Sequence, residues 1–156
     1  IKLGKKITIT DPDMTRFSIT MDDALDFILD SAKIGKGSEI FIPKLRTYSI
    51  MDVKDVLFEL IDNVEEEYVG IRPGEKLHEI LINLDEMRYT FELDNKYVIH
   101  KSSKIENNDI EKNEKMKKVD GSQPYSSDLT EKIPKNELKI ILKNFLTNYK
   151  EQDLKK

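Results

Sequence analysis

The stretch Gly70-Ile-Arg-Pro-Gly-Glu-Lys-Leu-His-Glu79 decides how the rest of this sequence is interpreted. A short apolar run from Tyr68 to Ile71 stops at Arg72, and a Pro-Gly pair then breaks the chain direction. An amphipathic, helix-like segment starts at Glu75. We therefore predict a strand, a turn and a helix in this order.

The predicted turn brings two opposite charges together. It holds Arg72 close to Glu75, beside the amino terminus of the expected helix, which adds positive potential. A guanidinium group forks onto phosphate oxygens, while a carboxylate accepts hydrogen bonds from sugar hydroxyls, so this turn is suited to both parts of a nucleotide. The alternative is a solvated loop that contains a local ion pair.

Composition indicates one modest domain that is packed only in part. The 156 residues are 38% hydrophobic and 36% charged, and the net charge of −4 gives no support for a nucleic-acid surface. The sequence contains no cysteine, so it has no disulfide or thiolate metal site. It shows no apolar run of membrane-spanning length and no signal peptide. We expect a cytoplasmic protein with no membrane or nucleic-acid partner.

Local signals predict a mixed α/β fold made of short strands and amphipathic helices. Short β-branched or apolar runs between turn signals predict strands at 6–10, 39–42, 68–71, 90–93 and 96–100. Besides the helix from Glu75, three further helices are expected after Thr20, Ser49 and Pro134. Their apolar stripes, expected to be buried, are Ala24, Leu25, Ile28, Leu29 and Ala32; Val53, Val56, Leu57, Leu60, Ile61 and Val64; and Leu138, Ile141, Leu142, Phe145 and Leu146.

The distribution of apolar residues divides the chain into three parts. Residues 1–101 contain most of the expected strands and helices, whereas residues 102–122 are rich in Lys, Glu, Asn and Asp and indicate a polar, disordered linker. Residues 123–150 form a terminal segment whose helix needs a partner surface on this domain or on another subunit. Because the first residue is isoleucine and Gly4 resembles a helix cap, we expect the sequence to start inside a longer protein.

Arg16 stands among apolar neighbours in Met14-Thr-Arg-Phe-Ser-Ile19. Since a buried, unpaired guanidinium is costly, Arg16 must stay hydrated or bind an anion. Pairing with one of three nearby acids is the alternative: Asp11, Asp13 or Asp22.

Two other patterns carry no predicted chemistry. Tyr97 and Lys101 match the Tyr-x-x-x-Lys spacing of the short-chain dehydrogenases, but this pair needs a helix. In the expected strand they lie roughly 13 Å apart, so we interpret the match as chance. His78 lacks the second histidine of a zinc-protease helix, and no metal site is expected.

Three motifs, taken together and in order, resemble a known family. They are Asp11–Thr20, the strand-like Glu39–Lys44 and Gly70–Glu79. They are similar to the carboxy-terminal part of the nucleotide-sugar 4,6-dehydratases that act on UDP-N-acetylglucosamine, which belong to the extended short-chain dehydrogenase family and serve polysaccharide and flagellin-glycan biosynthesis. The resemblance covers about residues 1–100 and, more loosely, 123–146.

The resemblance assigns roles that spacing alone does not. In such enzymes an amino-terminal Rossmann domain binds NADP or NAD and carries the catalytic residues, while the smaller carboxy-terminal portion binds the UDP group. The resemblance implies that Arg16 and Arg72 contact the diphosphate from two sides and that Glu75 accepts a hydrogen bond from the uridine ribose. Thr8, on a strand expected near the uracil, and Met14 complete the candidate UDP-binding set.

The Rossmann half is absent from this sequence. It contains no Gly-x-x-Gly-x-x-Gly loop, so neither the cofactor site nor the catalytic residues are expected in this fragment. For the intact lyase, expected to be a homo-oligomer, the resemblance implies oxidation at sugar C4, loss of water across C5 and C6, and return of hydride to C6. Two alternatives stay open: an epimerase of the same superfamily, and a non-catalytic interaction or oligomerisation module.

Overall fold

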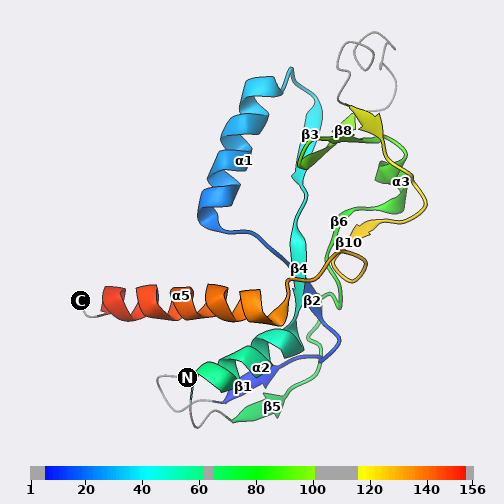
Figure 1. The fold of residues 1–156 in the computed structure, drawn as a ribbon. Helices are drawn as coiled ribbons and strands as arrows, with labels where there is room; N and C mark the ends of the chain where they lie inside the picture. Colours follow the sequence, from blue (N-terminus) through cyan, green and yellow to red (C-terminus); the bar gives the residue numbers. More distant parts are fainter. Residues whose placement is uncertain (1–5, 62–64, 101–115, 154–156) are drawn as a thin grey trace. The chain divides into compact units, whose positions relative to one another are not determined.

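The structure is a computed structural model that describes residues 6–61, 65–100 and 116–153 (Figure 1). It has the predicted mixed α/β fold. The strands are β1 (Ile7–Ile9), β2 (Thr15–Ser18), β3 (Glu39–Pro43), β4 (Arg46–Ser49), β5 (Glu66–Tyr68), β6 (Ile80–Ile82), β7 (Thr90–Leu93), β8 (Lys96–His100), β9 (Lys117–Lys118) and β10 (Tyr125–Ser126). The helices are α1 (Met21–Ile34), α2 (Ile50–Leu60), α3 (Leu84–Met87) and α5 (Lys135–Asp153).

The chain divides into two compact units, each assembled from segments that are distant in the sequence. The first unit contains Ile1–Phe17, Arg46–Glu79 and Glu131–Lys156, and the second contains Ser18–Leu45 and Ile80–Thr130. The three consecutive parts expected from composition, 1–101, 102–122 and 123–150, stay a prediction. Within the expected linker, residues 102–115 lie outside the described residues, whereas Lys117–Lys118 form β9 and pair with β7.

The first unit contains two small sheets. Strand β1 pairs in parallel with β5, which places Ile7 opposite Glu66, and β2 pairs with β4. The strand predicted at 68–71 starts earlier, at Glu66, and ends at Tyr68. Its register with β1 explains the shift, because Ile9, the last residue of β1, already faces Tyr68.

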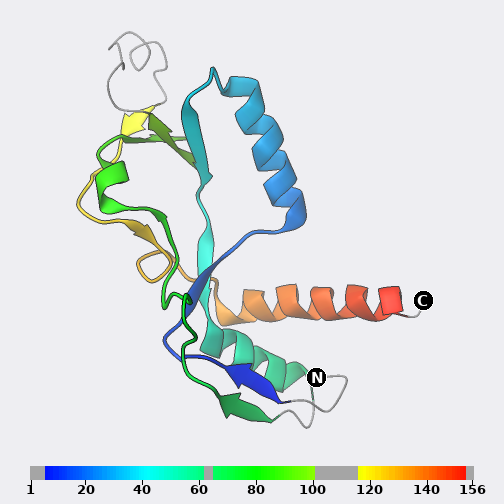
Figure 2. The same ribbon diagram turned by 180° about the vertical axis from the view of Figure 1, so that it is seen from behind.

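Helices α2 and α5 form the hydrophobic core of the first unit, and they run beside each other in both views (Figures 1 and 2). Val56 of α2 is fully buried and packs with Ile133 and Leu138. The partly buried residues around this cluster are Tyr48, Val53, Leu60 and Leu142. Val53, Val56 and Leu60 of the α2 stripe are therefore core as predicted. Leu57 and Ile61 are half-buried, and Val64 lies outside the described residues. Helix α5 finds its partner on this chain, although Ile141 and Phe145 of its stripe are exposed.

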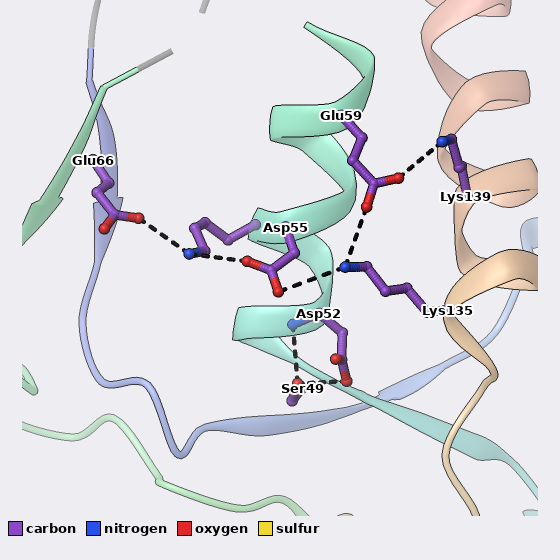
Figure 3. A network of polar contacts seen from close by, with 8 residues as sticks. Ser49, Asp52, Asp55, Glu59, Glu66, Lys135 and Lys139 are labelled. Carbon is purple, nitrogen blue, oxygen red and sulfur yellow. Dashed lines mark hydrogen bonds and ion pairs between the residues drawn. The ribbon is translucent and has the colours of Figure 1, made fainter.

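Ion pairs reinforce the contact between α2 and α5 (Figure 3). The Lys139 ammonium lies 2.8 Å from Glu59, and the Lys135 ammonium lies 3.2 Å from Glu59 and 3.7 Å from Asp55. Hydrogen bonds from Lys139 and then Lys135 hold the pKa of the Glu59 carboxyl below its usual range. At the start of α2, the predicted cap is present, since Ser49 Oγ accepts the N–H of Asp52 at 3.0 Å.

The second unit is built on an antiparallel sheet with the order β3-β8-β7-β9. The predicted hairpin is confirmed: β7 and β8 pair across Asp94-Asn95, and Asp94 adopts a left-handed φ of 50°. A separate pair, β6 with β10, places the buried Tyr125 opposite Ile82.

Helix α1 has the predicted start but not the predicted buried face. The Thr20 side chain accepts the N–H of Asp23 at 3.1 Å, and the helix ends before Gly35. Most of the predicted stripe is nevertheless exposed, with 52% of Leu25, 59% of Ile28 and 59% of Leu29 accessible. The more covered positions are Ala24, Phe27 and Ser31. Apolar spacing identifies an amphipathic helix correctly, but it does not say whether the rest of the chain covers the apolar side.

Candidate functional site

Residues 70–79 form a turn that is not followed by the predicted helix. Gly70 and Gly74 have φ values of 77° and 88°, a region that suits glycine. The next element is the strand β6, so the predicted helix from Glu75 is wrong. The backbone groups of Ile80–Ile82 form hydrogen bonds with the strand Tyr125–Ser126 and not within a helix. The positive potential expected from a helix amino terminus is therefore not available at this turn.

Arg72 and Glu75 close this turn. The Arg72 N–H donates to Glu75 Oε2 at 3.0 Å, and the Glu75 N–H donates to the Arg72 carbonyl at 3.0 Å. The Arg72 guanidinium lies 3.9 Å from Glu75 Oε1, and its side chain is 65% exposed. The local ion pair considered from the sequence is present, but it is long. The guanidinium therefore remains accessible to a further anion.

The Arg16 guanidinium holds the end of the same segment. Its Nη1 donates to the Leu77 carbonyl at 3.1 Å and its Nη2 to the Lys76 carbonyl at 2.9 Å. Its Nε lies 3.6 Å from a carboxylate oxygen of Glu79. Asp11, Asp13 and Asp22 were the acids expected as alternative partners. Among the described residues, Arg16 lies instead beside Glu79, which is more than sixty positions further along the chain.

Two residues before Arg16, Thr15 in β2 and Met14 just ahead of it, contribute to this attachment. The buried Thr15 donates its N–H to the Leu77 carbonyl at 3.1 Å, and its hydroxyl lies 2.9 Å from Nδ1 of His78. Met14 is only 2% exposed, and its sulfur lies 3.4 Å from Nη2 of Arg16. Met14 therefore packs under the guanidinium. It is not placed to touch a ligand with its side chain.

The candidate residues fall into two linked pairs. Arg16 contacts Met14, and Arg72 contacts Glu75; the segment that contains Arg72 and Glu75 continues into the carbonyls that Arg16 binds. Thr8 lies exposed on β1 in the same unit. The arrangement presents an exposed cation beside an acid, on a turn that hydrogen bonds fasten at its carboxy-terminal end. This combination is suited to an anionic ligand that also carries hydroxyl groups.

The remaining sequence patterns concern Tyr97, metal ligation and membrane-spanning helices. Tyr97 lies in strand β8 and not in a helix, while Lys101 lies outside the described residues. Within the described ranges, no group of three or more His, Cys, Asp or Glu residues is arranged to hold a metal ion. Across the same ranges, no helix is long and apolar enough to cross a membrane.

Comparison with known proteins identifies the family. Residues 1–101 match the family model described as polysaccharide biosynthesis protein. The chain belongs to this polysaccharide biosynthesis protein family. The resemblance proposed from the three sequence motifs is therefore confirmed.

The relatives of this chain include two kinds of nucleotide-sugar enzyme. It is 41% identical over 130 residues to the UDP-N-acetylglucosamine 4,6-dehydratase (inverting) of Campylobacter jejuni, a match that covers 80% of this chain and 38% of the relative. It is 31% identical over 156 residues to the UDP-glucose 4-epimerase of Rickettsia massiliae, covering 99% of this chain and 45% of the relative.

A solved structure supports the fold. The X-ray structure of Pen from Bacillus thuringiensis superposes with a TM-score of 0.74 at 33% identity, over 89% of this chain and 40% of that protein. The chain thus spans less than half the length of each of these relatives.

Proposed function

We propose that this chain is the UDP-binding portion of a nucleotide-sugar 4,6-dehydratase that acts on UDP-N-acetylglucosamine. The observation that carries the proposal is the double hydrogen bond from Arg16 to the backbone of residues 76 and 77, which fastens the segment bearing Arg72. Because the backbone of this segment is already held in place, less conformational entropy is lost when its exposed guanidinium binds a phosphate. The name of the Campylobacter jejuni relative supports the choice of substrate.

Within this proposal Arg72 makes the direct contact with the diphosphate. Glu75 already accepts the Arg72 N–H with Oε2, so its Oε1 is the oxygen proposed to accept from the ribose. Thr8, exposed on β1, is proposed to lie near the uracil.

Arg16 and Met14 are proposed to support the site and not to contact UDP first. The Arg16 guanidinium donates to carbonyl oxygens, so a direct contact with the diphosphate requires it to release part of that bonding. We therefore propose that Arg16 serves UDP binding mainly by positioning the segment, with Met14 packed beneath it. A further contact from Arg16 to the diphosphate stays a prediction.

The chemical step is proposed to belong to the complete enzyme. This sequence has no Gly-x-x-Gly-x-x-Gly loop, so its residues do not fit a nicotinamide cofactor, and NADP or NAD is proposed to bind elsewhere in the polypeptide. The contribution of this chain is remote binding energy, which holds the hexose in position through its UDP group. A cytoplasmic location, lyase activity and a homo-oligomeric state likewise stay predictions.

An epimerase is the second candidate, because the Rickettsia massiliae relative matches 99% of this chain. Both candidates use a UDP-sugar, so they share the proposed role of Arg72. They differ in the product. A full-length polypeptide incubated with UDP-N-acetylglucosamine and followed by NMR yields a 4-keto-6-deoxy sugar if it is a dehydratase and a C4 epimer if it is an epimerase.

Titration of the ¹⁵N-labelled chain with UDP tests the binding proposal. We expect the amide signals of residues 70–72, 74–77 and 14–16 to shift with UDP, and to shift less with uridine, which lacks the diphosphate. Unchanged spectra at saturating UDP contradict the proposal. A stable oligomer that is indifferent to nucleotide favours the interaction module instead.

A further inference from the structure

The side chain of His78 contacts a buried residue of β2 that lies far away in the sequence. Its ring nitrogen Nδ1 lies 2.9 Å from the hydroxyl oxygen of Thr15, 63 positions earlier in the chain. Thr15 is 5% exposed, and both residues belong to the first unit. A hydroxyl both donates and accepts, so the pair forms a hydrogen bond whichever ring nitrogen of the histidine carries the hydrogen. UDP binding as proposed above gives this imidazole no role.

Thr15 connects His78 to the guanidinium of Arg16. Nη1 of Arg16 donates to the Thr15 carbonyl at 2.7 Å and to the Leu77 carbonyl at 3.1 Å, so it bridges β2 and the segment that follows the turn. The Thr15 N–H donates to the same Leu77 carbonyl at 3.1 Å. The backbone of Thr15 thus binds the guanidinium and the segment, while its hydroxyl binds the imidazole. A change in how the Thr15 hydroxyl is held therefore reaches Arg16 directly.

The imidazole holds a part of the segment that the Arg16 guanidinium does not hold. The guanidinium donates to the backbone carbonyls of residues 76 and 77, and its Nε lies 3.6 Å from a carboxylate oxygen of Glu79, beyond hydrogen-bond distance. Two carbonyls fix the point where the turn ends, but the direction of the chain beyond them depends on residue 78. Because its ring is tied to Thr15, His78 prevents the segment from pivoting on these two carbonyls.

The turn that carries Arg72 leads directly into these contacts. The Glu75 N–H donates to the Arg72 carbonyl at 3.0 Å and closes the turn, and residue 76 follows at once. The Arg72 side chain is 65% exposed and lies 3.9 Å from Glu75, so the direction of its guanidinium is set mainly by the backbone that carries it. A pivot of residues 76–78 would therefore displace the group proposed to bind the diphosphate.

We propose that His78 is a positioning residue of the nucleotide site. Through the Thr15 hydroxyl it keeps Arg16 and residues 76–78 in place, and it thereby fixes Arg72 for the diphosphate. His78 acts through Thr15 and does not touch the ligand. Its effect on UDP binding rests on the proposed function, whereas its effect on the turn is a property of the chain without any ligand. The two effects can therefore be measured separately.

Three substitutions at His78 separate the hydrogen bond from the bulk of the ring. The amide of asparagine is attached to Cβ as the ring is, so one of its polar atoms lies near the position of Nδ1 and can donate or accept. The amide of glutamine stands one bond further out, near the position of Nε2. We expect His78→Asn to keep the contact with Thr15, and His78→Gln and His78→Ala to lose it.

Hydrogen exchange of the ligand-free chain, followed by NMR, is the first measurement. The amides of Thr15, Arg72 and Glu75 are suitable reporters, because each donates a hydrogen bond within this region. Their exchange should become about 2- to 12-fold faster in His78→Ala and His78→Gln, the equivalent of one hydrogen bond, and should return to near the native rate in His78→Asn. The amide of Val56, in the core of the unit, should keep its rate in all three variants.

The second histidine of the chain supplies the matched control. His100→Asn removes an imidazole from the second unit and should leave the exchange of the three reporter amides unchanged. Native rates at these amides in His78→Ala would overturn the proposal. Equal acceleration in all three His78 variants, or at the Val56 amide as well, would assign His78 a general packing role and would also overturn it.

Calorimetric titration with UDP is the second measurement. His78→Ala should raise the Kd of UDP by about 2- to 12-fold, and His78→Asn should bind nearly as the native chain does. Thr15→Val removes the hydroxyl with little change of shape, so adding His78→Ala to it should weaken binding little further. An unchanged Kd in His78→Ala, or fully additive losses in the double variant, would overturn the proposal. A native chain that does not bind UDP contradicts the proposed function alone, because the exchange rates still decide whether His78 positions the turn.

Discussion

Arg16 and Lys76 lie sixty positions apart in the sequence, yet Nη2 of the arginine donates a hydrogen bond to the lysine carbonyl at 2.9 Å. Together with the bond from Nη1 to Leu77, this contact attaches strand β2 to the segment that carries Arg72 and Glu75. A guanidinium is suited to this task because its donors are fixed in a planar fork. The geometry of the candidate UDP site therefore depends on Arg16, which lies outside the turn that carries Arg72 and Glu75.

Removing the Arg16 guanidinium should loosen this segment. Arg16→Met keeps most of the aliphatic stem but loses the donors, and we expect a loss of about 1.5 to 3 kcal/mol in the free energy of unfolding, the range for hydrogen bonds that involve a charged group. Hydrogen exchange measured by mass spectrometry should speed up over residues 70–79. Lys33→Met, which removes an exposed cation paired with Asp30, is the control. Unchanged exchange at residues 70–79 in Arg16→Met would show that other contacts hold the segment.

The contact between α2 and α5 should dominate the stability of the first unit. Leu138 is 3% exposed and packs against Val56, so Leu138→Ala should lower the free energy of unfolding by about 2 to 5 kcal/mol. Ile140→Ala is the matched control, since Ile140 stands on the same helix with 60% exposure and should change little. Urea denaturation compares the two variants. Equal losses would mean that α5 does not use this face.

The Tyr125 hydroxyl should stabilise the second unit in a pH-dependent way. It accepts the Leu45 N–H at 2.6 Å and donates to the Leu45 carbonyl at 3.1 Å. Tyr125→Phe should cost about 1 to 3 kcal/mol at neutral pH, because it leaves the backbone groups of Leu45 without this partner. Burial raises the pKa of the Tyr125 hydroxyl.

The sign of the alkaline effect follows from that raised pKa. The stabilisation is fully present below the usual tyrosine pKa of about 10, and it is lost as the pH rises through the higher value of the folded state. The stability difference between the native chain and Tyr125→Phe should therefore shrink above about pH 10. Tyr89→Phe, at a 42% exposed tyrosine, is the control. A difference that stays constant with pH would contradict this account.

Acid should weaken the pairing of α2 with α5. The pKa of Glu59 is lowered by Lys139 and Lys135, so its stabilisation is present above the usual glutamate pKa of about 4.3 and is lost as the pH falls through the lower folded value. Glu59→Gln should therefore show a shallower loss of thermal stability on acidification than the native chain. Glu67→Gln, on the exposed strand β5, should behave like the native chain. Parallel curves for Glu59→Gln and the native chain would exclude this role.

Elements defined by local signals could be predicted from the sequence. Thr20 and Ser49 cap their helices as expected, since each side-chain oxygen needs only a backbone N–H three residues away. The hairpin around Asp94-Asn95 is equally local. These features depend on neighbours in the chain and therefore leave a pattern in the sequence.

Features that depend on distant partners could not be predicted. Ile80–Ile82 form a strand because Tyr125–Ser126 pair with them, and no local pattern reveals this. The acceptors of Arg16 are backbone carbonyls, which every residue possesses, so no residue type identifies them. The spacing of Arg72 and Glu75 did predict their pairing. The exposed stripe of α1 shows the same limit, because amphipathic spacing does not specify the covering surface.

Calorimetric titration of the chain with UDP, compared between the native protein and Arg72→Ala, tests the central claim most directly. The exposed Arg72 side chain should be removable without unfolding, and its loss should weaken UDP binding by about 1.5 to 3 kcal/mol, or roughly 12- to 160-fold in Kd. Arg88→Ala is the matched control, since Arg88 is 69% exposed and lies 3.8 Å from Asp85 in a comparable pair. The account predicts weakened binding in Arg72→Ala alone; equal UDP affinity in all three proteins would contradict it.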